Sequence, residues 1–358
     1  MIIADIVKIF IPAALSFGVG IVCAPILTHY LYKYRAWKKI PNKTALDGHE
    51  AVEFGKLREQ LHPDTETKTP RMGGVLIWAT TALVTLGLWL LDYFGAFAIA
   101  DKLDFLSRSQ TWIPLVTLVV GGIIGLVNDL LDIRPHGERG LRLSMRLLLI
   151  FIISSFIGWW FYSKLEVTSV GIPLDGVFAL GVLIIPFFVL LTLGLYAGGV
   201  IDGIDGLSGG VFASIFASYA GIAFFQDQIN LAAFCATLVG AILAFLWFNI
   251  PPARFWMTET GTMGLTITIA VVAFMTDTLG EGYGVAALPI IAFPLFATVL
   301  SNILQIGSKK FLGKKLFRIA PLHHHFEAIG WPSYKVTMRY WILSAMCAVI
   351  GMTVALLK

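Results

Sequence analysis

The chain has 358 residues, of which 57% are hydrophobic and 13% charged, with a net charge of +4 and a mean hydropathy of +0.82. A soluble protein could not cover this much apolar side chain with its polar surface. The composition therefore excludes a water-soluble globular domain and predicts an integral membrane protein.

Apolar runs long enough to cross a bilayer recur along the whole chain. A spanning helix needs roughly 17 to 25 such residues. We expect spans at about 6–32, 72–92, 112–131, 144–163, 177–197, 207–225, 230–249, 262–277, 286–306 and 336–357. The sequence thus predicts an all-α membrane protein of ten transmembrane helices, forming one domain over residues 1–358.

Lysine and arginine are distributed unevenly between the two sets of loops. The loops after the first, third, fifth, seventh and ninth spans, with their flanks, hold 21 of these residues, and the other side holds five. The positive-inside rule then places the odd loops in the cytoplasm and both termini outside. We expect a multi-pass membrane protein whose polar motifs face the cytoplasm.

Two local patterns interrupt the helical spans. Pro289 and Pro294 lie within the ninth span, where a missing amide donor breaks or kinks a helix, so this span is expected to be broken. Residues 165–176 carry β-branched residues around a glycine turn and predict a small external β-hairpin. The three cysteines lie in apolar runs without paired spacing and are interpreted as buried thiols.

Asp202 and Asp205 lie three residues apart in the glycine-rich segment 197–210. If this stretch is helical, the spacing puts both carboxylates on one face, while the glycines allow backbone amides to approach a phosphate closely. The alternative is a helix cap with a sharp turn, for which one aspartate would suffice.

Asp129 and Glu259 provide further acidic groups at the same ends of other predicted spans. Together with Asp202 and Asp205 they are expected to converge on one catalytic site. Carboxylate oxygens suit Mg²⁺, which one or two carboxylates and substrate phosphates commonly hold. The site is therefore predicted to bind Mg²⁺ and to serve phosphoryl transfer.

Residues 323–325 are three consecutive histidines in a basic loop before the last span. Their imidazoles can bond to an anionic phosphate substrate, although a solvated turn or a fortuitous metal-binding run remains open. Lys68, Arg71, Arg139, Arg142 and Arg146 lie on the same side of the predicted topology, and each of them also fits simple positive-inside anchoring.

From about Thr69 to its C-terminus, the chain resembles the phospho-N-acetylmuramoyl-pentapeptide transferase family. The most specific match is Phe317-Arg-Ile-Ala-Pro-Leu-His-His-His-Phe-Glu327 followed by Gly330-Trp-Pro332. Thr69-Pro70 with Met72-Gly-Gly74, Asp202-Gly-Ile-Asp-Gly-Leu207 and Trp247-Phe-Asn249 before Pro252-Ala253 also match. The resemblance implies transfer of phospho-N-acetylmuramoyl-pentapeptide from its UDP carrier to undecaprenyl phosphate, with Mg²⁺, giving UMP and lipid I.

The resemblance also implies roles for individual residues. Glu259 resembles the family's metal ligand, and Asp202 is expected to be a second one. Asp202 and Asp205 are also expected to line the catalytic and nucleotide pocket. Trp256 stands where the family has a phenylalanine that stacks on uracil, which an indole can also do. The expected substrate contacts are Lys68, Thr69, Arg139, Asn249, Trp256, Gln305, His323, His324 and His325. The expected partners are the nucleotide sugar, undecaprenyl phosphate and membrane lipid, with no nucleic acid, and a homodimer is left open.

Six further positions depart from the family pattern. Its paired aspartates are here Asn128-Asp129, and its Gly-Asp-Thr-Gly-Ser is Thr258-Glu-Thr-Gly-Thr262. Gly199 and Arg71 replace an asparagine and a threonine. Asn128 cannot act as a carboxylate base, and the extra methylene of Glu259 moves its carboxylate by roughly 1.5 Å.

Three other interpretations stay open at this stage. The first is a related transferase for another UDP-linked amino sugar, against which the intact His-His-His-Phe-Glu argues. The second is a catalytically weakened homologue that binds nucleotide or lipid, which the changes at Asn128 and Glu259 motivate. The third is a transporter with broken spans, which the clustering of acidic groups at one edge disfavours.

Overall fold

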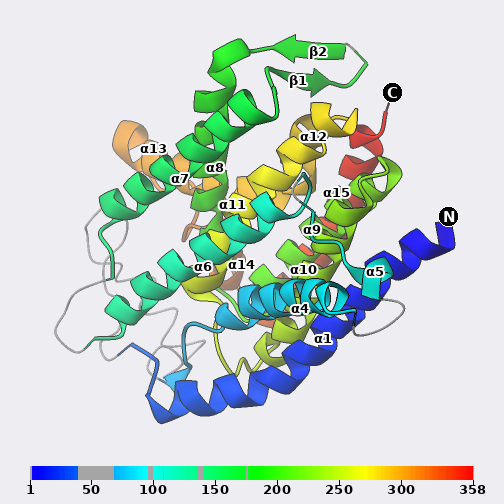
Figure 1. Ribbon diagram of the computed structural model, residues 1–358. Coiled ribbons are helices and arrows are strands. Elements are labelled where there is room, and N and C mark those ends of the chain that lie inside the picture. The colour runs from blue at the N-terminus through cyan, green and yellow to red at the C-terminus, as the bar shows by residue number, and fades with distance from the viewer. Residues whose placement is uncertain are drawn as a thin grey trace.

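The computed structural model describes residues 2–38, 68–95, 100–107, 109–134, 140–174 and 176–357. Arg139, expected to contact substrate, lies outside these described residues. The described chain is a bundle of long helices with one small β-hairpin at its edge (Figure 1). The all-α prediction for a multi-pass membrane protein is confirmed.

Long apolar helices account for most of the described residues. They are α1 (Ile2–Lys33), α4 (Val75–Tyr93), α6 (Trp112–Asp132), α7 (Leu143–Lys164), α8 (Ile184–Gly198), α9 (Leu207–Phe225), α10 (Ile229–Asn249), α11 (Thr258–Met275), α12 (Gly284–Ile291), α13 (Phe293–Leu312) and α15 (Ser333–Ala355). Short elements are α5 (Ala100–Leu103), α14 (Leu322–Ala328), η1 (Gly181–Leu183), η2 (Gly199–Ile201) and η3 (Thr278–Gly280).

The described residues contain nine helices that are long and apolar enough to cross a membrane. The bent pair α12 and α13, whose axes differ by 67° at a break between Ile291 and Phe293, makes a tenth when its two helices are counted as one span. Pro294 lies in the first turn of α13, where its missing amide donor costs no helical hydrogen bond. The broken ninth span is therefore confirmed.

The hairpin connects α7 to α8. Strands β1 (Ser169–Ile172) and β2 (Gly176–Ala179) pair antiparallel, with Ser169 opposite Ala179. Asp277, after α11, accepts hydrogen bonds from the amides of Gly171 in β1 at 2.7 Å and Val285 in α12 at 2.9 Å. Burial raises the pKa of Asp277 to about 6, although these hydrogen bonds act in the opposite direction. The end of the bundle that carries β1 and β2 is called the hairpin end below.

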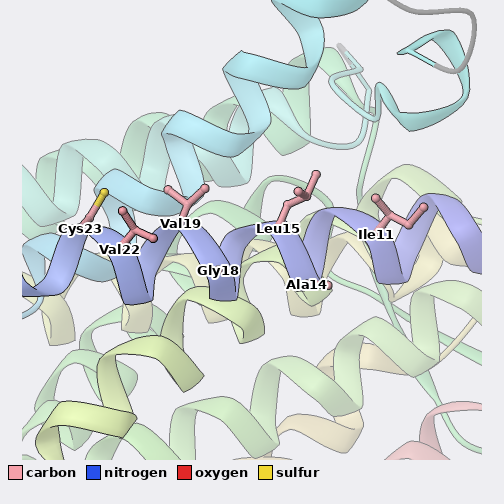
Figure 2. Close-up of a pocket in the computed structure, with 7 residues that line it drawn as sticks. All are labelled: Ile11, Ala14, Leu15, Gly18, Val19, Val22 and Cys23. Atoms are coloured by element: carbon pink, nitrogen blue, oxygen red, sulfur yellow. The ribbon is translucent and has the colours of Figure 1, made fainter.

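Helix α11 lies at the centre of the bundle and α1 at its edge (Figure 1). In α11, 94% of the residues are buried, whereas only 22% of the apolar stretch of α1 is buried. Figure 2 shows a shallow apolar groove that runs along α1 from Ile11 to Cys23, with every lining side chain contributed by this helix. Such a surface suits contact with lipid acyl chains.

Glycines bring α6 and α11 into backbone contact. A Cβ atom on Gly125 would lie 2.0 Å from the Glu259 carbonyl oxygen, and one on Gly121 would lie 2.7 Å from the Gly264 Cα. Small residues permit such close approach between membrane helices. The position of Glu259 therefore depends directly on the packing of α6 against α11.

We predict that Gly125→Ala destabilises the protein by about 1–3 kcal/mol, because the added methyl group overpacks the contact between α6 and α11. Gly87→Ala in α4 is the matched control, since a Cβ there meets no atom within 4 Å. This control should be neutral or stabilising by up to about 1 kcal/mol, as alanine is the better helix former. Thermal unfolding in detergent measures both, and equal effects would contradict the close packing.

Candidate functional site

Asp129 at the end of α6 is fully buried and bonds to the first turn of α11. Its Oδ2 accepts hydrogen bonds from the Thr258 hydroxyl, the Thr260 amide at 2.9 Å and the Thr260 hydroxyl at 2.6 Å. The first amides of a helix have no partner within that helix. Asp129 therefore caps α11 from a neighbouring helix, a role that its sequence context did not reveal.

The charge of Asp129 is balanced by Arg71. The Nη2 atom of Arg71 lies 3.4 Å from Asp129 Oδ1 and 3.3 Å from Asp132 Oδ2, and the Lys38 amino group lies 3.1 Å from the same Asp132 oxygen. A buried carboxylate is stable only when it is paired and hydrogen-bonded. The arginine that replaces the family's threonine thus neutralises the cap of α11.

Thr258 connects Asp129 to Asp202. Its amide donates to Asp202 Oδ2 at 2.7 Å, and its hydroxyl, which donates to Asp129, also accepts from the Met72 amide at 3.1 Å. Thr258 has a φ of 54°, a left-handed conformation that is unusual for a β-branched residue. Such strain costs about 1–3 kcal/mol, and the three hydrogen bonds offset it.

Asp202 lies between α8 and α9 and faces the same helix end. Its Oδ1 accepts from the Ser208 hydroxyl at 2.6 Å. Burial raises the pKa of Asp202, against the opposing effects of the hydrogen bonds from Ser208 and Thr258 and the charge of Arg71. Asp202 and Glu259, which sequence reasoning assigned as metal ligands, are thereby brought to the first turn of one helix.

Asp205 holds the loop that carries Trp256. Its two oxygens accept hydrogen bonds from the Ala253 amide and the Trp256 indole N–H, both at 3.0 Å. The indole is partly buried, so one edge is fixed by Asp205 while the ring retains exposed surface. The structure assigns Asp205 a positioning role toward Trp256.

Glu259 lies in the first turn of α11, at the end of a span as its sequence context suggested. Its Oε1 accepts hydrogen bonds from Arg146 Nη1 in α7 and from the Tyr196 hydroxyl at 3.3 Å. Its Oε2 is buried and has no hydrogen-bond partner among the described residues. Sequence reasoning singled out Glu259 and Arg146 separately but missed their ion pair and the contact with Tyr196.

The histidines form the short helix α14 and do not lie in an open loop. A Cβ on Gly203 would lie 2.6 Å from His323 Nε2 and 2.8 Å from His324 Nε2, so both rings face the segment between Asp202 and Asp205. His324 Nδ1 lies 2.7 Å from Glu327 Oε2, which fixes the orientation of this ring.

His325 is directed differently. Its Nδ1 accepts from the Arg318 amide at 3.2 Å, and its ring contacts Phe317. Two of the three predicted histidines are therefore gathered at the aspartate segment, while the third stabilises the chain leading into α14.

Two predicted substrate contacts use their amide groups within the protein. Asn249 accepts from the Gly206 amide at 3.0 Å and donates to the Phe255 carbonyl at 2.9 Å. Gln305 donates to the Phe317 carbonyl at 2.9 Å and accepts from the amides of Leu316 and Phe317. Both side chains hold loops of the site in place in this structure.

Lys68 and Thr69 directly precede a backbone segment that bonds to Trp256. The Pro70 carbonyl accepts from the Trp256 amide at 2.9 Å, and the Gly73 amide donates to the Trp256 carbonyl at 2.8 Å. Lys68 is exposed and Thr69 is partly buried. Both residues therefore border Trp256 at the same end of the bundle.

Asn128 is used structurally in this chain. Its Oδ1 accepts from the Leu141 amide at 2.9 Å and so holds the segment that leads into α7. An amide oxygen performs this task without introducing a second negative charge beside Asp129.

The described residues contain no group of three histidine, cysteine, aspartate or glutamate side chains arranged to hold a metal ion. Mg²⁺ commonly uses only one or two protein carboxylates together with phosphates and water. The free Oε2 of Glu259, with Asp202 bonded to the adjacent turn, fits such a site. The arrangement as a whole places two guanidinium groups, two imidazoles and an aromatic ring near the first turn of α11, and guanidinium and imidazole groups can bond to phosphate oxygens.

The chain is similar to proteins of known activity. Residues 111–277 match the family described as glycosyl transferase family 4. The chain is 30% identical to the phospho-N-acetylmuramoyl-pentapeptide-transferase of Clostridium perfringens, over 96% of this chain and 98% of that protein. It is 30% identical to the enzymes of that name from Geobacillus kaustophilus, over 96% of each chain, and Caldanaerobacter subterraneus, over 96% of this chain and 98% of that protein.

Proposed function

The chain belongs to the phospho-N-acetylmuramoyl-pentapeptide transferase family, and we propose that it transfers phospho-N-acetylmuramoyl-pentapeptide from UDP to undecaprenyl phosphate. The products are UMP and the lipid-linked sugar peptide, lipid I, a precursor of peptidoglycan. The observation that carries this proposal is the gathering of Asp202, Asp205 and Glu259 around the first turn of α11 in a chain related to these transferases over nearly its whole length.

The reaction exchanges one phosphorus–oxygen bond for another. An oxygen of the lipid phosphate forms a bond to the sugar-bearing phosphorus, and the bond from that phosphorus to the bridging oxygen breaks, releasing UMP. The attacking phosphate is already ionised near neutral pH, because its second pKa is about 6. No general base is then required, which agrees with the amide at Asn128 and with the use of Asp129 as a helix cap.

Mg²⁺ is the cofactor that we propose, with Glu259 and Asp202 as its protein ligands. When bound, it neutralises charge that develops on the transferring phosphoryl group. The buried free oxygen of Glu259 supports this assignment, since such an oxygen otherwise remains unsatisfied.

The residues around the metal ligands are proposed to orient the nucleotide sugar. Trp256, fixed by Asp205, is placed to stack on the uracil ring. His323 and His324 face the same segment and offer ring nitrogens to phosphate or sugar oxygens. Asn249 and Gln305 then act through the loops that they hold, and Lys68 and Thr69 border the entrance.

The position of the site at the ends of the helices suits a lipid acceptor. A polyprenyl chain can remain among apolar side chains of the bundle surface while its phosphate reaches the interface. We further propose that this end faces the cytoplasm of the bacterial inner membrane, because most lysine and arginine residues flank it. Both termini would then lie outside.

Thiol labelling in intact cells tests this orientation. In a variant without the three native cysteines, Leu174→Cys on the exposed hairpin should react with a membrane-impermeant maleimide. Lys314→Cys, beyond α13, should react only after the membrane is permeabilised. The reverse pattern would place the site on the external side and contradict the proposal.

The activity is tested with purified protein, radiolabelled UDP-N-acetylmuramoyl-pentapeptide, undecaprenyl phosphate and Mg²⁺. Labelled lipid should form, and Glu259→Gln should reduce its rate by at least about 10²-fold without lowering the melting temperature, because a neutral amide replaces a charged ligand. Asp227→Asn, which neutralises an exposed carboxylate between α9 and α10 at the hairpin end, should leave the rate unchanged.

The second candidate function is nucleotide or lipid binding without turnover. The ion pair between Arg146 and Glu259 favours it, because a neutralised ligand attracts metal less strongly. Wild-type protein that binds the UDP-sugar but forms no labelled lipid with any divalent cation would establish this alternative and remove the transferase assignment.

A further inference from the structure

The side chains of Glu259 and Arg146 make an ion pair that leaves polar atoms of both partners unused. One guanidinium nitrogen, Nη1, bonds to one carboxylate oxygen, Oε1. Arg146 Nε and Glu259 Oε2 are both buried and have no hydrogen-bond partner among the described residues. An arginine and a carboxylate frequently form two parallel bonds. This pair makes a single contact instead.

The carboxylates near this ion pair bond to other cations. Arg71 bonds to Asp129 and Asp132, and Lys38 adds to Asp132, so these carboxylates have their own cations. Arg146 is the cation that bonds to Glu259, and both side chains keep 22% of their surface exposed. The pair is therefore close to neutral and reachable from the site.

We propose that Arg146 is a latch on Glu259 that couples metal binding to nucleotide binding. In the free protein the guanidinium neutralises Glu259 and repels a divalent cation. When a nucleoside diphosphate binds, the guanidinium moves to its phosphates, and both oxygens of Glu259 become available to the metal. This inference rests on the proposed function of the site. It adds that the metal binds tightly only once the nucleotide is bound.

The physical basis is the balance of charge before and after the exchange. A divalent cation that approaches the pair gains from Glu259 and loses from Arg146 at nearly the same distance, so little attraction remains. The diphosphate supplies the negative charge that the guanidinium needs once it leaves Glu259, and a guanidinium can bind phosphate through two parallel hydrogen bonds. The Tyr196 hydroxyl stays bonded to Oε1 and keeps the carboxylate oriented during the exchange.

Reciprocity gives this proposal a measurable form. If the nucleotide tightens metal binding by some factor, the metal must tighten nucleotide binding by the same factor. Coupling of this kind is typically about 5- to 150-fold. Mutation that removes the Arg146 guanidinium should raise metal affinity in the absence of nucleotide and reduce the coupling between metal and nucleotide binding.

Mn²⁺ binding to purified full-length protein, followed by electron paramagnetic resonance, tests the latch. Wild-type protein alone should bind Mn²⁺ weakly. Saturating UDP should tighten Mn²⁺ binding to the protein by about tenfold or more, after the Mn²⁺–UDP complex in solution is subtracted. Arg146→Gln should bind Mn²⁺ about tenfold more tightly than wild type without UDP, and UDP should then change its affinity by less than about threefold.

Arg142→Gln is the matched control, because it removes the same charge one turn earlier from an exposed position. It should leave Mn²⁺ affinity and coupling as in wild type. Arg146→Lys retains the charge and should show an intermediate gain, which keeps the test available if Arg146→Gln does not fold.

The outcomes separate this inference from the proposed function. Wild type whose UDP and Mn²⁺ affinities are coupled, together with Arg146 variants that bind Mn²⁺ no more tightly than wild type, would overturn the latch and leave the function intact. Wild type that binds neither UDP nor Mn²⁺, separately or together, would overturn both.

Discussion

The capping of α11 by Asp129 is the interaction on which the site depends. A carboxylate from α6 accepts three hydrogen bonds from Thr258 and Thr260 in the buried centre of the bundle. The same turn carries Glu259, and the Thr258 amide donates to Asp202. One buried anion thus fixes the start of the helix and both proposed metal ligands. Its charge would be costly in this setting without Arg71 and the hydroxyl groups that surround it.

The glycine contacts between α6 and α11 make this cap possible. Because Gly125 has no side chain, the backbone of α6 approaches the Glu259 carbonyl closely. Asp129, one turn further along α6, can then reach the first turn of α11. At the hairpin end Asp277 bonds to β1 and α12 and fixes the other end of α11. The central helix is consequently held at both ends by carboxylates, while its apolar middle is packed on all sides. A helix fixed in this way holds Glu259 and the Thr258 contact with Asp202 in a constant position relative to each other.

Much of the fold followed from the sequence because membrane spans are long apolar runs, and proline marked the break between α12 and α13. Asp202 and Glu259 were recognisable because charged groups at span ends stand out in an apolar chain. The pairing of Arg146 with Glu259 and the capping role of Asp129 could not be read in this way. They join residues more than one hundred positions apart, and no local spacing encodes them. Asn249 and Gln305 resembled substrate contacts, yet their amides bond to the backbone of neighbouring loops, and a side-chain amide can serve either purpose.

Hydrogen–deuterium exchange at residues 256–262 tests the dependence of the site on Asp129 most directly. The amides of Thr258 and Thr260 are bonded to Asp202 and Asp129, so this segment should be protected in the wild-type protein. Asp129→Asn places an amide donor among existing donors and should cause loss of protection there by about 10-fold or more, corresponding to a cost of about 1–3 kcal/mol. Asp132→Asn, which changes a neighbouring carboxylate that bonds to Arg71 and Lys38, should leave the segment protected. Equal protection in wild type and Asp129→Asn would contradict the capping of α11 as the organising interaction of the site.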